Sequence, residues 1–213
     1  MLLTRIELDP TKRTTIMALS NPNRFHGAIE KSRMIEGERI LWRIDELGGR
    51  KYLMILSPSP TNGNFLAEQF GYPGTPPEQK SYSALLNRIK EGSVWNFRLT
   101  ANPTFSSWSD RKDSQDRGKV KGEISTSVQL KWLERKAAAN GFSLKPNQFG
   151  VVSSRWVTFR KRTENRKVSL TQVTYEGMLT VTNPELFKRA LVDGIGRGKA
   201  YGMGMLTVVT PHV

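Results

Sequence analysis

Apolar and polar residues alternate along several short segments in the first half of the chain, a pattern typical of half-buried β-strands. These segments are residues 2–8, 39–44, 52–56 and 94–101. Gly48 and Gly49 lie between the second and third segments and favour a hairpin turn there. The pattern therefore predicts four strands, two of which are joined as a hairpin.

Helix signals lie between these predicted strands. Asn21 can accept hydrogen bonds from backbone amides at a helix start, and Pro22 suits the first helical position, so a helix is predicted from there to about Arg33. A second helix is predicted over residues 83–90, after a long loop that begins in the proline-containing run 57–60. The order strand, helix, strand, strand, helix, strand is that of a ferredoxin-like unit.

The second half partly repeats this order. Helices are predicted over residues 126–140 and 184–192, and strands over residues 149–159, 168–182 and 205–209. The segment between the halves is polar and charged, which favours a linker. The sequence thus predicts an α+β protein with two tandem ferredoxin-like (RRM-like, βαββαβ) domains. The expected boundaries are residues 1–102, a linker at 103–121, and residues 122–213.

Composition and charge narrow the choice of partners. The chain has 33 Lys and Arg against 19 Asp and Glu, a net charge of +14 that favours a polyanionic partner. It has no cysteine and only two histidines, far apart in sequence, so we expect neither a metal site nor another cofactor. No apolar run approaches the roughly 20 residues that cross a bilayer, and the N-terminus lacks the apolar core of a signal peptide. A soluble, cytoplasmic protein with no membrane partner is expected.

His26 is the first candidate for chemistry. It lies shortly after the predicted helix start, near backbone amides that favour anions. Imidazole exchanges a proton near neutral pH, so a histidine beside a phosphate suits acid–base catalysis on a phosphodiester. The alternative is an exposed helical histidine without a special contact, and the sequence leaves both interpretations open.

A glycine-rich loop near the C-terminus is the second candidate. Five glycines fall within residues 194–204, together with Arg197 and Lys199. Gly196 and Gly198 flank Arg197 and permit a close backbone approach, so a phosphate cradle is one interpretation. The other is a tight turn that seats the last strand, because the spacing fits neither the GxGxxG motif nor the Walker A motif.

A basic stretch between the two long predicted strands is the third candidate. Its cations are Arg155, Arg160, Lys161, Arg162, Arg166 and Lys167. A basic hairpin can neutralise phosphates, and an aromatic residue such as Trp156 or Phe159 can stack on an unpaired base. Such charge runs also occur on plain solvated faces. Because the chain lacks helix-turn-helix and zinc-finger spacing, and ferredoxin-like sheets commonly bind RNA, RNA is the favoured polyanion.

Several segments together give the chain a resemblance to a known family. They are His26 early in the first predicted helix, residues 95–103 (WNFRLTANP), residues 129–136 (QLKWLERK), residues 175–181 (YEGMLTV) and the terminal loop with its following strand. Along nearly its full length the chain resembles the CasE family, which are CRISPR-associated endoribonucleases that process repeat RNA in type I-E systems.

The resemblance implies a fold of tandem ferredoxin-like domains and a specific activity. The protein would bind a CRISPR repeat stem-loop and cut at the 3′ base of the stem without a metal ion, by attack of the RNA's own 2′-hydroxyl. The product would stay bound, and the protein would join the other subunits of the type I-E surveillance complex. His26 matches the family's catalytic histidine, and the nearby Arg24 is expected to contact RNA.

One position departs from the family. Where the family often has a tyrosine three residues before the histidine, this chain has Asn23, whose amide cannot transfer a proton near neutral pH. Lys199 or Tyr201 could act as the second proton-transfer group if the glycine-rich loop packs beside the first helix. Otherwise Asn23 only positions the RNA and cleavage is slow. A non-catalytic RNA-binding or scaffold subunit, and a DNA-binding protein, are the alternatives.

Overall fold

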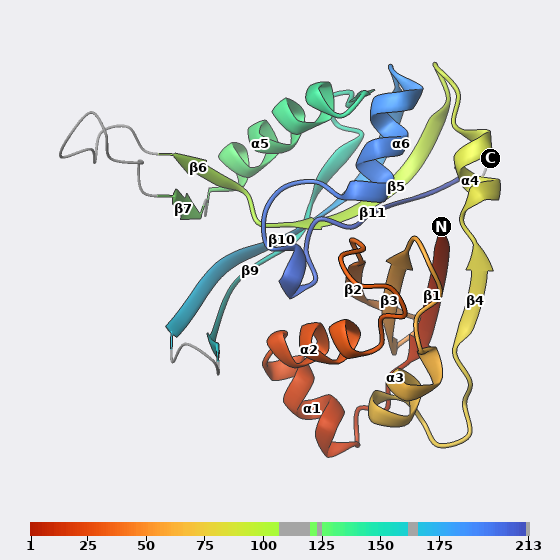
Figure 1. Cartoon of the computed structure of the whole chain (residues 1–213). Helices are drawn as coiled ribbons and strands as arrows, with labels where there is room; N and C mark the ends of the chain where they lie inside the picture. Colours follow the sequence, from red (N-terminus) through yellow and green to blue (C-terminus); the bar gives the residue numbers. More distant parts are fainter. Residues whose placement is uncertain (107–119, 123–124, 162–165, 212–213) are drawn as a thin grey trace.

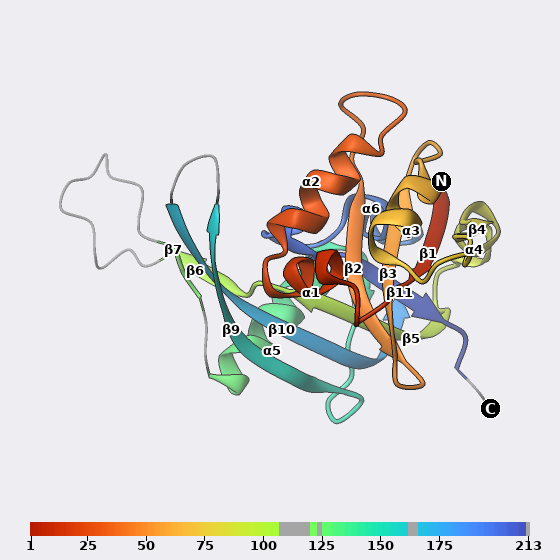
Figure 2. The same ribbon diagram turned by 90° about the horizontal axis from the view of Figure 1, so that it is seen from below.

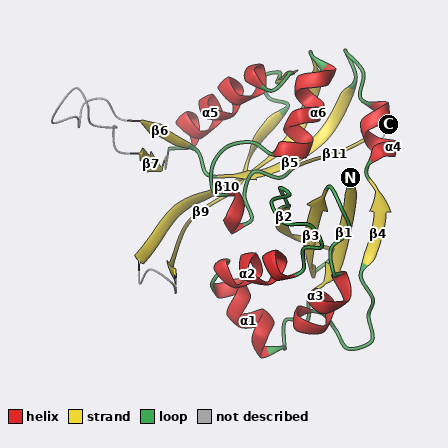
Figure 3. Ribbon diagram, viewed as in Figure 1, coloured by secondary structure: helices red, strands yellow, loops and turns green. Residues whose placement is uncertain are grey.

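The protein has an α+β fold with two antiparallel sheets, as a computed structural model shows (Figures 1 and 3). The structure describes residues 1–106, 120–122, 125–161 and 166–211. Each sheet has the strand order of a ferredoxin-like unit, so the predicted fold class is confirmed. Within the described residues no helix is both long and apolar enough to cross a membrane.

The first sheet contains four antiparallel strands in the spatial order β2-β3-β1-β4. They are β1 (Leu2–Glu7), β2 (Leu41–Leu47), β3 (Arg50–Ser57) and β4 (Glu78–Ser81). The predicted turn between β2 and β3 is confirmed, because Gly48 and Gly49 both adopt positive φ angles, 58° and 77°. The strand predicted over residues 2–8 is confirmed as β1.

Four helices accompany this sheet. They are α1 (Arg13–Ser20), α2 (Asn23–Lys31), α3 (Gly63–Phe70) and α4 (Ser83–Arg88). The sequence predicted α2 and α4 but missed α1 and α3. No side-chain cap precedes α1, and α3 follows shortly after the proline-containing run that marked a loop. The buried side chains between the helices and one face of the sheet include Ile6, Phe25, Ile29, Leu53, Ile55, Leu66 and Phe70. This core fixes α2 on the sheet.

The second sheet has the order β11-β5-β10, and both β8 and β9 pair with β10. Its strands are β5 (Val94–Ala101), β8 (Phe142–Ser143), β9 (Phe149–Lys161), β10 (Arg166–Val181) and β11 (Leu206–Val209). Its helices are α5 (Thr126–Ala139), α6 (Pro184–Asp193) and the 3₁₀ turn η1 (Lys199–Tyr201). The predicted start of α6 is confirmed, because the Asn183 side chain accepts from the Leu186 amide at 3.0 Å.

The strand over residues 94–101 forms as predicted, but its assignment to the first sheet is wrong. This strand, β5, pairs with β10 and β11, and is therefore the first strand of the second unit. The fourth strand of the first sheet is instead β4, which was predicted as loop. All four residues of β4 are exposed and polar, so no alternation marks it. Alternation in β5 identifies a strand but not its neighbours.

The expected linker at 103–121 contains two short strands at its ends. β6 (Thr104–Ser106) pairs antiparallel with β7 (Val120–Gly122). Residues 107–119 of the expected linker lie outside the described residues. The segment therefore begins and ends in a small two-stranded ladder that projects from the second unit (Figure 1).

The two units pack with their helices on the outer sides and their sheets toward each other (Figures 1 and 2). The hydrophobic core of the second unit continues across this boundary, since it includes Leu41 of β2 and Leu56 of β3. In the same boundary Arg43 of β2 reaches the backbone of β5 and the residues at the start of β11. This packing places α2 of the first unit beside η1 of the second. Asn21, which precedes α2, contacts β9 of the long hairpin.

Candidate active site

The helix that carries His26 starts at the predicted cap. Asn21 is extended, with φ −138° and ψ 94°, and its side-chain oxygen accepts from the Asn23 amide at 3.2 Å. Pro22 already has helical dihedral angles, φ −56° and ψ −21°. Asn21 also follows the last residue of α1, so the same residue separates two helices. The predicted roles of Asn21 and Pro22 are confirmed.

Three backbone amides in the first turn of α2, which were expected to be free, already donate hydrogen bonds within the protein. The Asn23 amide binds the Asn21 side chain, the Arg24 amide donates to the Asn21 carbonyl at 2.9 Å, and the His26 amide donates to the Pro22 carbonyl at 3.1 Å. These amides already have acceptors, so the interpretation that they attract an anion is wrong.

The His26 side chain is neither buried in the core nor fully solvated. It is 34% exposed, and its Nδ1 atom lies 3.5 Å from Oε1 of Glu30, one turn further along α2. Glu30 also receives a hydrogen bond from Arg33 at 2.6 Å. Exposure of the ring permits contact with a ligand, and the carboxylate favours one orientation of the ring.

The glycine-rich loop forms a compact structure around η1. Gly198 and Gly202 flank η1 and have φ angles of 86° and 77°, which only glycine adopts without strain. A Cβ on Gly202 would lie 2.8 Å from the Trp42 ring of β2. A Cβ on Gly196, the other glycine expected to approach a ligand, would lie 3.1 Å from the Trp132 ring. The packing of the loop therefore requires glycine at these positions.

The loop lies beside α2, as the assignment of Lys199 or Tyr201 to the site required. α2 contacts η1, and the Tyr201 ring packs edge-on against Phe159 of β9 with 4.8 Å between ring centroids. Asn21 at the start of α2 donates to the Arg160 carbonyl at 3.4 Å. The structure therefore brings together three elements that are distant in sequence: the helix with His26, the turn with Lys199 and Tyr201, and the arginine-rich strand.

Lys199 has an unusual electrostatic environment for a surface lysine. Partial burial lowers the pKa of its ammonium group, and the nearby Arg39 lowers this pKa further, while Asp193 partly opposes the change. The aliphatic part of the side chain lies close to Gly204, where a Cβ would be 3.1 Å from Cγ of Lys199. A lysine with a lowered pKa is better able to transfer a proton near neutral pH.

The basic stretch forms the hairpin of β9 and β10, as predicted. Arg155, Arg160 and Lys167 are exposed, and Arg160 lies opposite Lys167 in the ladder. Arg155 donates to the side chain of Gln172 at 2.6 Å. Lys161 pairs with Arg166 at the end of the described ladder, whereas Arg162 lies outside the described residues.

The two aromatic residues of the hairpin have different environments. Trp156 is 57% exposed, while Phe159 is buried against Tyr201. Only Trp156 therefore presents a ring to solvent. Arg24 of α2 and Arg197 of the glycine-rich loop are also exposed, so α2, the glycine-rich loop and the hairpin each carry exposed cations.

The structure adds two neighbours that the sequence analysis did not identify. Glu30 could have been found, because residues four apart share a helix face. Arg39 comes close to Lys199 only through the tertiary fold, which no local pattern reports. Across the described ranges, no cluster of three or more His, Asp or Glu side chains is arranged to hold a metal ion.

Comparison with known proteins relates this geometry to a family. Residues 1–210 match the family described as CRISPR associated protein. The chain belongs to this family. The resemblance stated from the sequence motifs is thereby confirmed, and the match spans both ferredoxin-like units.

Individual proteins are similar to this chain over different lengths. The CRISPR-associated endoribonuclease Cse3 of Thermus thermophilus is 29% identical over 220 residues, covering 98% of this chain and 99% of Cse3. The structure of Thermus thermophilus Cse3 bound to an RNA representing a pre-cleavage complex has a TM-score of 0.80, with 27% identity and 98% of each chain covered. The CRISPR system Cascade subunit CasE of Escherichia coli is 26% identical over 125 residues, covering 57% of this chain and 60% of CasE.

Proposed function

We propose that this CRISPR-associated protein is an endoribonuclease that binds the repeat stem-loop of a CRISPR transcript and cuts it at the 3′ base of the stem. The observation that carries the proposal is the contact between α2, which bears His26, and η1, which bears Lys199 and Tyr201. The similarity to Cse3, named as an endoribonuclease and solved with RNA, supports the same activity here.

The proposed reaction uses the RNA as its own nucleophile. The 2′-hydroxyl oxygen forms a bond to the adjacent phosphorus, and the bond from phosphorus to the 5′-oxygen of the next nucleotide breaks. One protein group takes the proton of the 2′-hydroxyl, another gives a proton to the leaving 5′-oxygen, and positive charge stabilises the phosphorane. These steps need no metal ion or cofactor, and we propose that the protein uses none.

His26 and Lys199 are the proposed proton-transfer pair. His26 is accessible and has a carboxylate partner, and the environment of Lys199 lowers its pKa. Tyr201 packs against Phe159 and is proposed to orient the ribose–phosphate junction by a hydrogen bond. Asn23 lies one turn before His26 on α2, and its amide is proposed to position the substrate.

The proposed RNA interface extends from this junction along the hairpin. Its members are Arg24, Arg155, Arg160, Lys161, Arg162, Arg166, Lys167, Gly196, Arg197 and Gly198. Cations on a hairpin contact phosphates and fix the register of a stem-loop on the protein. We further propose that the cleaved RNA stays bound and that the protein works in the cytoplasm with the other subunits of a type I-E surveillance complex. The similarity to the Cascade subunit CasE supports this assembly.

A non-catalytic RNA-binding subunit is the competing function, and Asn23 in place of a tyrosine favours it. Product analysis distinguishes the two. The protein is incubated in EDTA with its repeat RNA, and with the same RNA lacking the 2′-hydroxyl at the cut site. The proposal predicts one product with a 2′,3′-cyclic phosphate from the first RNA and none from the second. Binding of both RNAs without cleavage of either would support the scaffold function.

A further inference from the structure

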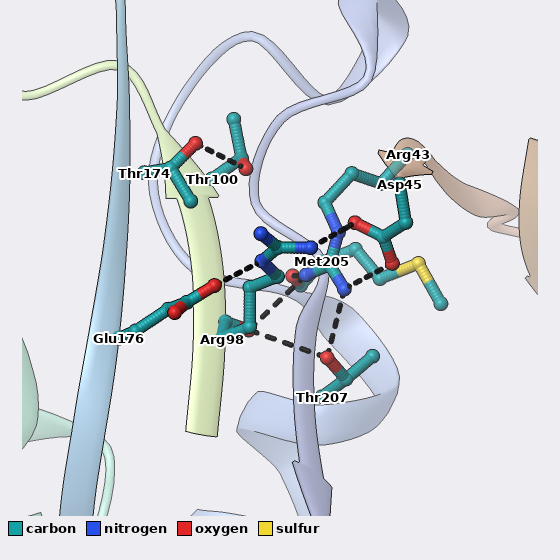
Figure 4. A network of polar contacts seen from close by, with 8 residues as sticks. All are labelled: Arg43, Asp45, Arg98, Thr100, Thr174, Glu176, Met205 and Thr207. Carbon is teal, nitrogen blue, oxygen red and sulfur yellow. Dashed lines mark hydrogen bonds and ion pairs between the residues drawn. The ribbon is translucent and has the colours of Figure 1, made fainter. Parts of the chain in front are cut away.

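Arg43 on β2 connects the two units through a fully engaged guanidinium group. The residue is 2% exposed, and its Nε and Nη2 atoms each donate to the Asp45 carboxylate at 2.7 Å. Its Nη1 atom donates to the carbonyl oxygens of Met205 and Arg98, at 2.8 and 3.1 Å, and its Nη2 atom donates to Oγ1 of Thr207 at 2.8 Å. One side chain of the first sheet thus binds β5, β11 and the residue that follows the glycine-rich loop (Figure 4).

Asp45 extends this contact into a chain of alternating charges. Its Oδ1 atom also accepts from Arg98 at 3.4 Å, and Arg98 forms an ion pair with Glu176 of β10 at 2.6 Å. Figure 4 shows these side chains converging between β2, β5 and β11. The network therefore links the four strands β2, β5, β10 and β11, and its geometry depends on the forked shape of the arginine side chain.

The same stretch of β2 touches the glycine-rich loop and α2. Trp42 lies against Gly202, and its ring centroid is 5.7 Å from that of Phe25, the residue before His26. Arg43 holds the Met205 carbonyl, directly after Gly204, whose amide donates to the Thr100 carbonyl. Two adjacent β2 residues therefore contact both the helix that carries His26 and the loop that carries Lys199.

A buried ion pair of this kind is a poor source of stability. The desolvation of two charges offsets most of their attraction, and neutral replacements of both partners are often as stable. The pair does fix the relative orientation of its two side chains, because a bidentate arginine–carboxylate contact constrains two hydrogen bonds at once. Its position between the two halves of the site makes orientation the more important effect.

We infer that Arg43 and Asp45 are positioning residues, which hold the glycine-rich loop at the distance from α2 that lets Lys199 and His26 act on one phosphate. The inference rests on the proposed endoribonuclease activity. Neither residue touches the RNA in this account. Their loss is expected to slow the chemical step, because a displacement of about 1 Å in a catalytic group can reduce a rate about 100-fold.

The test compares the full-length wild type with the double variant Arg43→Met/Asp45→Asn, which leaves neither partner as an unpaired charge. The matched control is Arg5→Met/Glu78→Gln, because Arg5 and Glu78 form a bidentate pair with two 2.7 Å contacts in the same sheet, away from the loop. Single-turnover cleavage at saturating RNA, the Kd for uncleaved RNA and amide hydrogen exchange are measured for each protein. Arg43→Lys provides a rescue variant that keeps the charge but not the fork.

The inference predicts a cleavage rate at least about ten-fold lower for Arg43→Met/Asp45→Asn, a Kd within about two-fold of wild type, and an intermediate rate for Arg43→Lys. Hydrogen exchange should rise in residues 194–204 and stay unchanged in β3, while the control pair changes nothing. An unchanged cleavage rate together with unchanged hydrogen exchange in residues 194–204 would overturn the inference. Hydrogen exchange that rises throughout the protein would also overturn it. If the wild type itself does not cleave, the proposed activity fails, and the exchange measurement still decides whether this pair holds the loop.

Discussion

Nδ1 of His26 lies 3.5 Å from a carboxylate oxygen of Glu30, one helical turn away on α2. A carboxylate near one imidazole nitrogen favours one orientation and one tautomer of the ring. The pair gives a half-exposed histidine a defined orientation. Glu30 is therefore expected to affect catalysis although it does not touch the RNA.

Glu30→Gln should lower the single-turnover cleavage rate about 10- to 100-fold, because the amide loses the charged contact that orients the ring. The Kd for RNA should stay within about two-fold, since the variant makes the surface no less positive. Cleavage and filter-binding measurements check both. The matched control is Glu185→Gln, which removes another helical carboxylate with a cation partner, Lys188. Equal effects of both variants would contradict a specific role for Glu30.

Lys199→Met should reduce the cleavage rate about 10²- to 10⁴-fold, the usual contribution of a proton-transfer group. Lys199→Arg keeps the positive charge, but a guanidinium group does not release its proton in this pH range, so its rate should stay at least about ten-fold below wild type. Rates measured between pH 6 and pH 9 test this, with Lys188→Arg as control. Wild-type activity in Lys199→Arg would show that Lys199 supplies only a positive charge and does not transfer a proton.

Gly202→Ala should destabilise the fold by about 1–3 kcal/mol, because the new methyl group would overlap the Trp42 ring. The matched control is Gly74→Ala. Gly74 has nearly the same φ angle, +75° against +77°, but open space around it. Both variants carry the same backbone strain, so the difference between their unfolding free energies in urea isolates the contact with Trp42. An equal loss of unfolding free energy in the two variants would mean that the glycine-rich loop does not pack on Trp42.

Reversal of two hairpin charges, Arg160→Glu with Lys167→Glu, should weaken RNA binding and flatten its salt dependence. Each lost phosphate contact lowers the slope of log Kd against log salt by about 0.7–0.9. The control is Lys90→Glu with Lys145→Glu, two exposed cations elsewhere that change the net charge equally. A salt titration of Kd measures the slopes. Identical slopes for both variants would show that only total charge matters and would remove the hairpin from the proposed interface.

Local patterns predicted those parts of the structure that depend on local chemistry. The caps at Asn21 and Asn183 and the glycine turn after β2 are fixed by side-chain hydrogen bonds and positive φ angles, and all three formed as predicted. Sheet membership was not predictable in the same way. β5 shows a clear apolar face, yet only tertiary packing determines that it joins β10 and β11.

The candidate site was likewise predictable from the sequence only in part. His26, Lys199 and Tyr201 could be named from residue type, loop composition and family resemblance, and the loop does lie beside α2. The bond from Arg43 to the Met205 carbonyl and the contact between Asp45 and Arg98 could not, because these partners lie 162 and 53 residues apart in sequence. Buried ion pairs between domains leave no periodic signal, so the network became visible only in the folded chain.

His26 is proposed to transfer a proton during metal-free cleavage of repeat RNA. The most direct test measures single-turnover cleavage by wild type and His26→Ala in EDTA, with the Kd for RNA measured in parallel. Wild type should cleave in EDTA, and His26→Ala should be at least about 10³-fold slower with its affinity for RNA unchanged. Cleavage by His26→Ala at the wild-type rate would contradict this role of His26. Loss of cleavage by the wild-type protein in EDTA would contradict the metal-free mechanism.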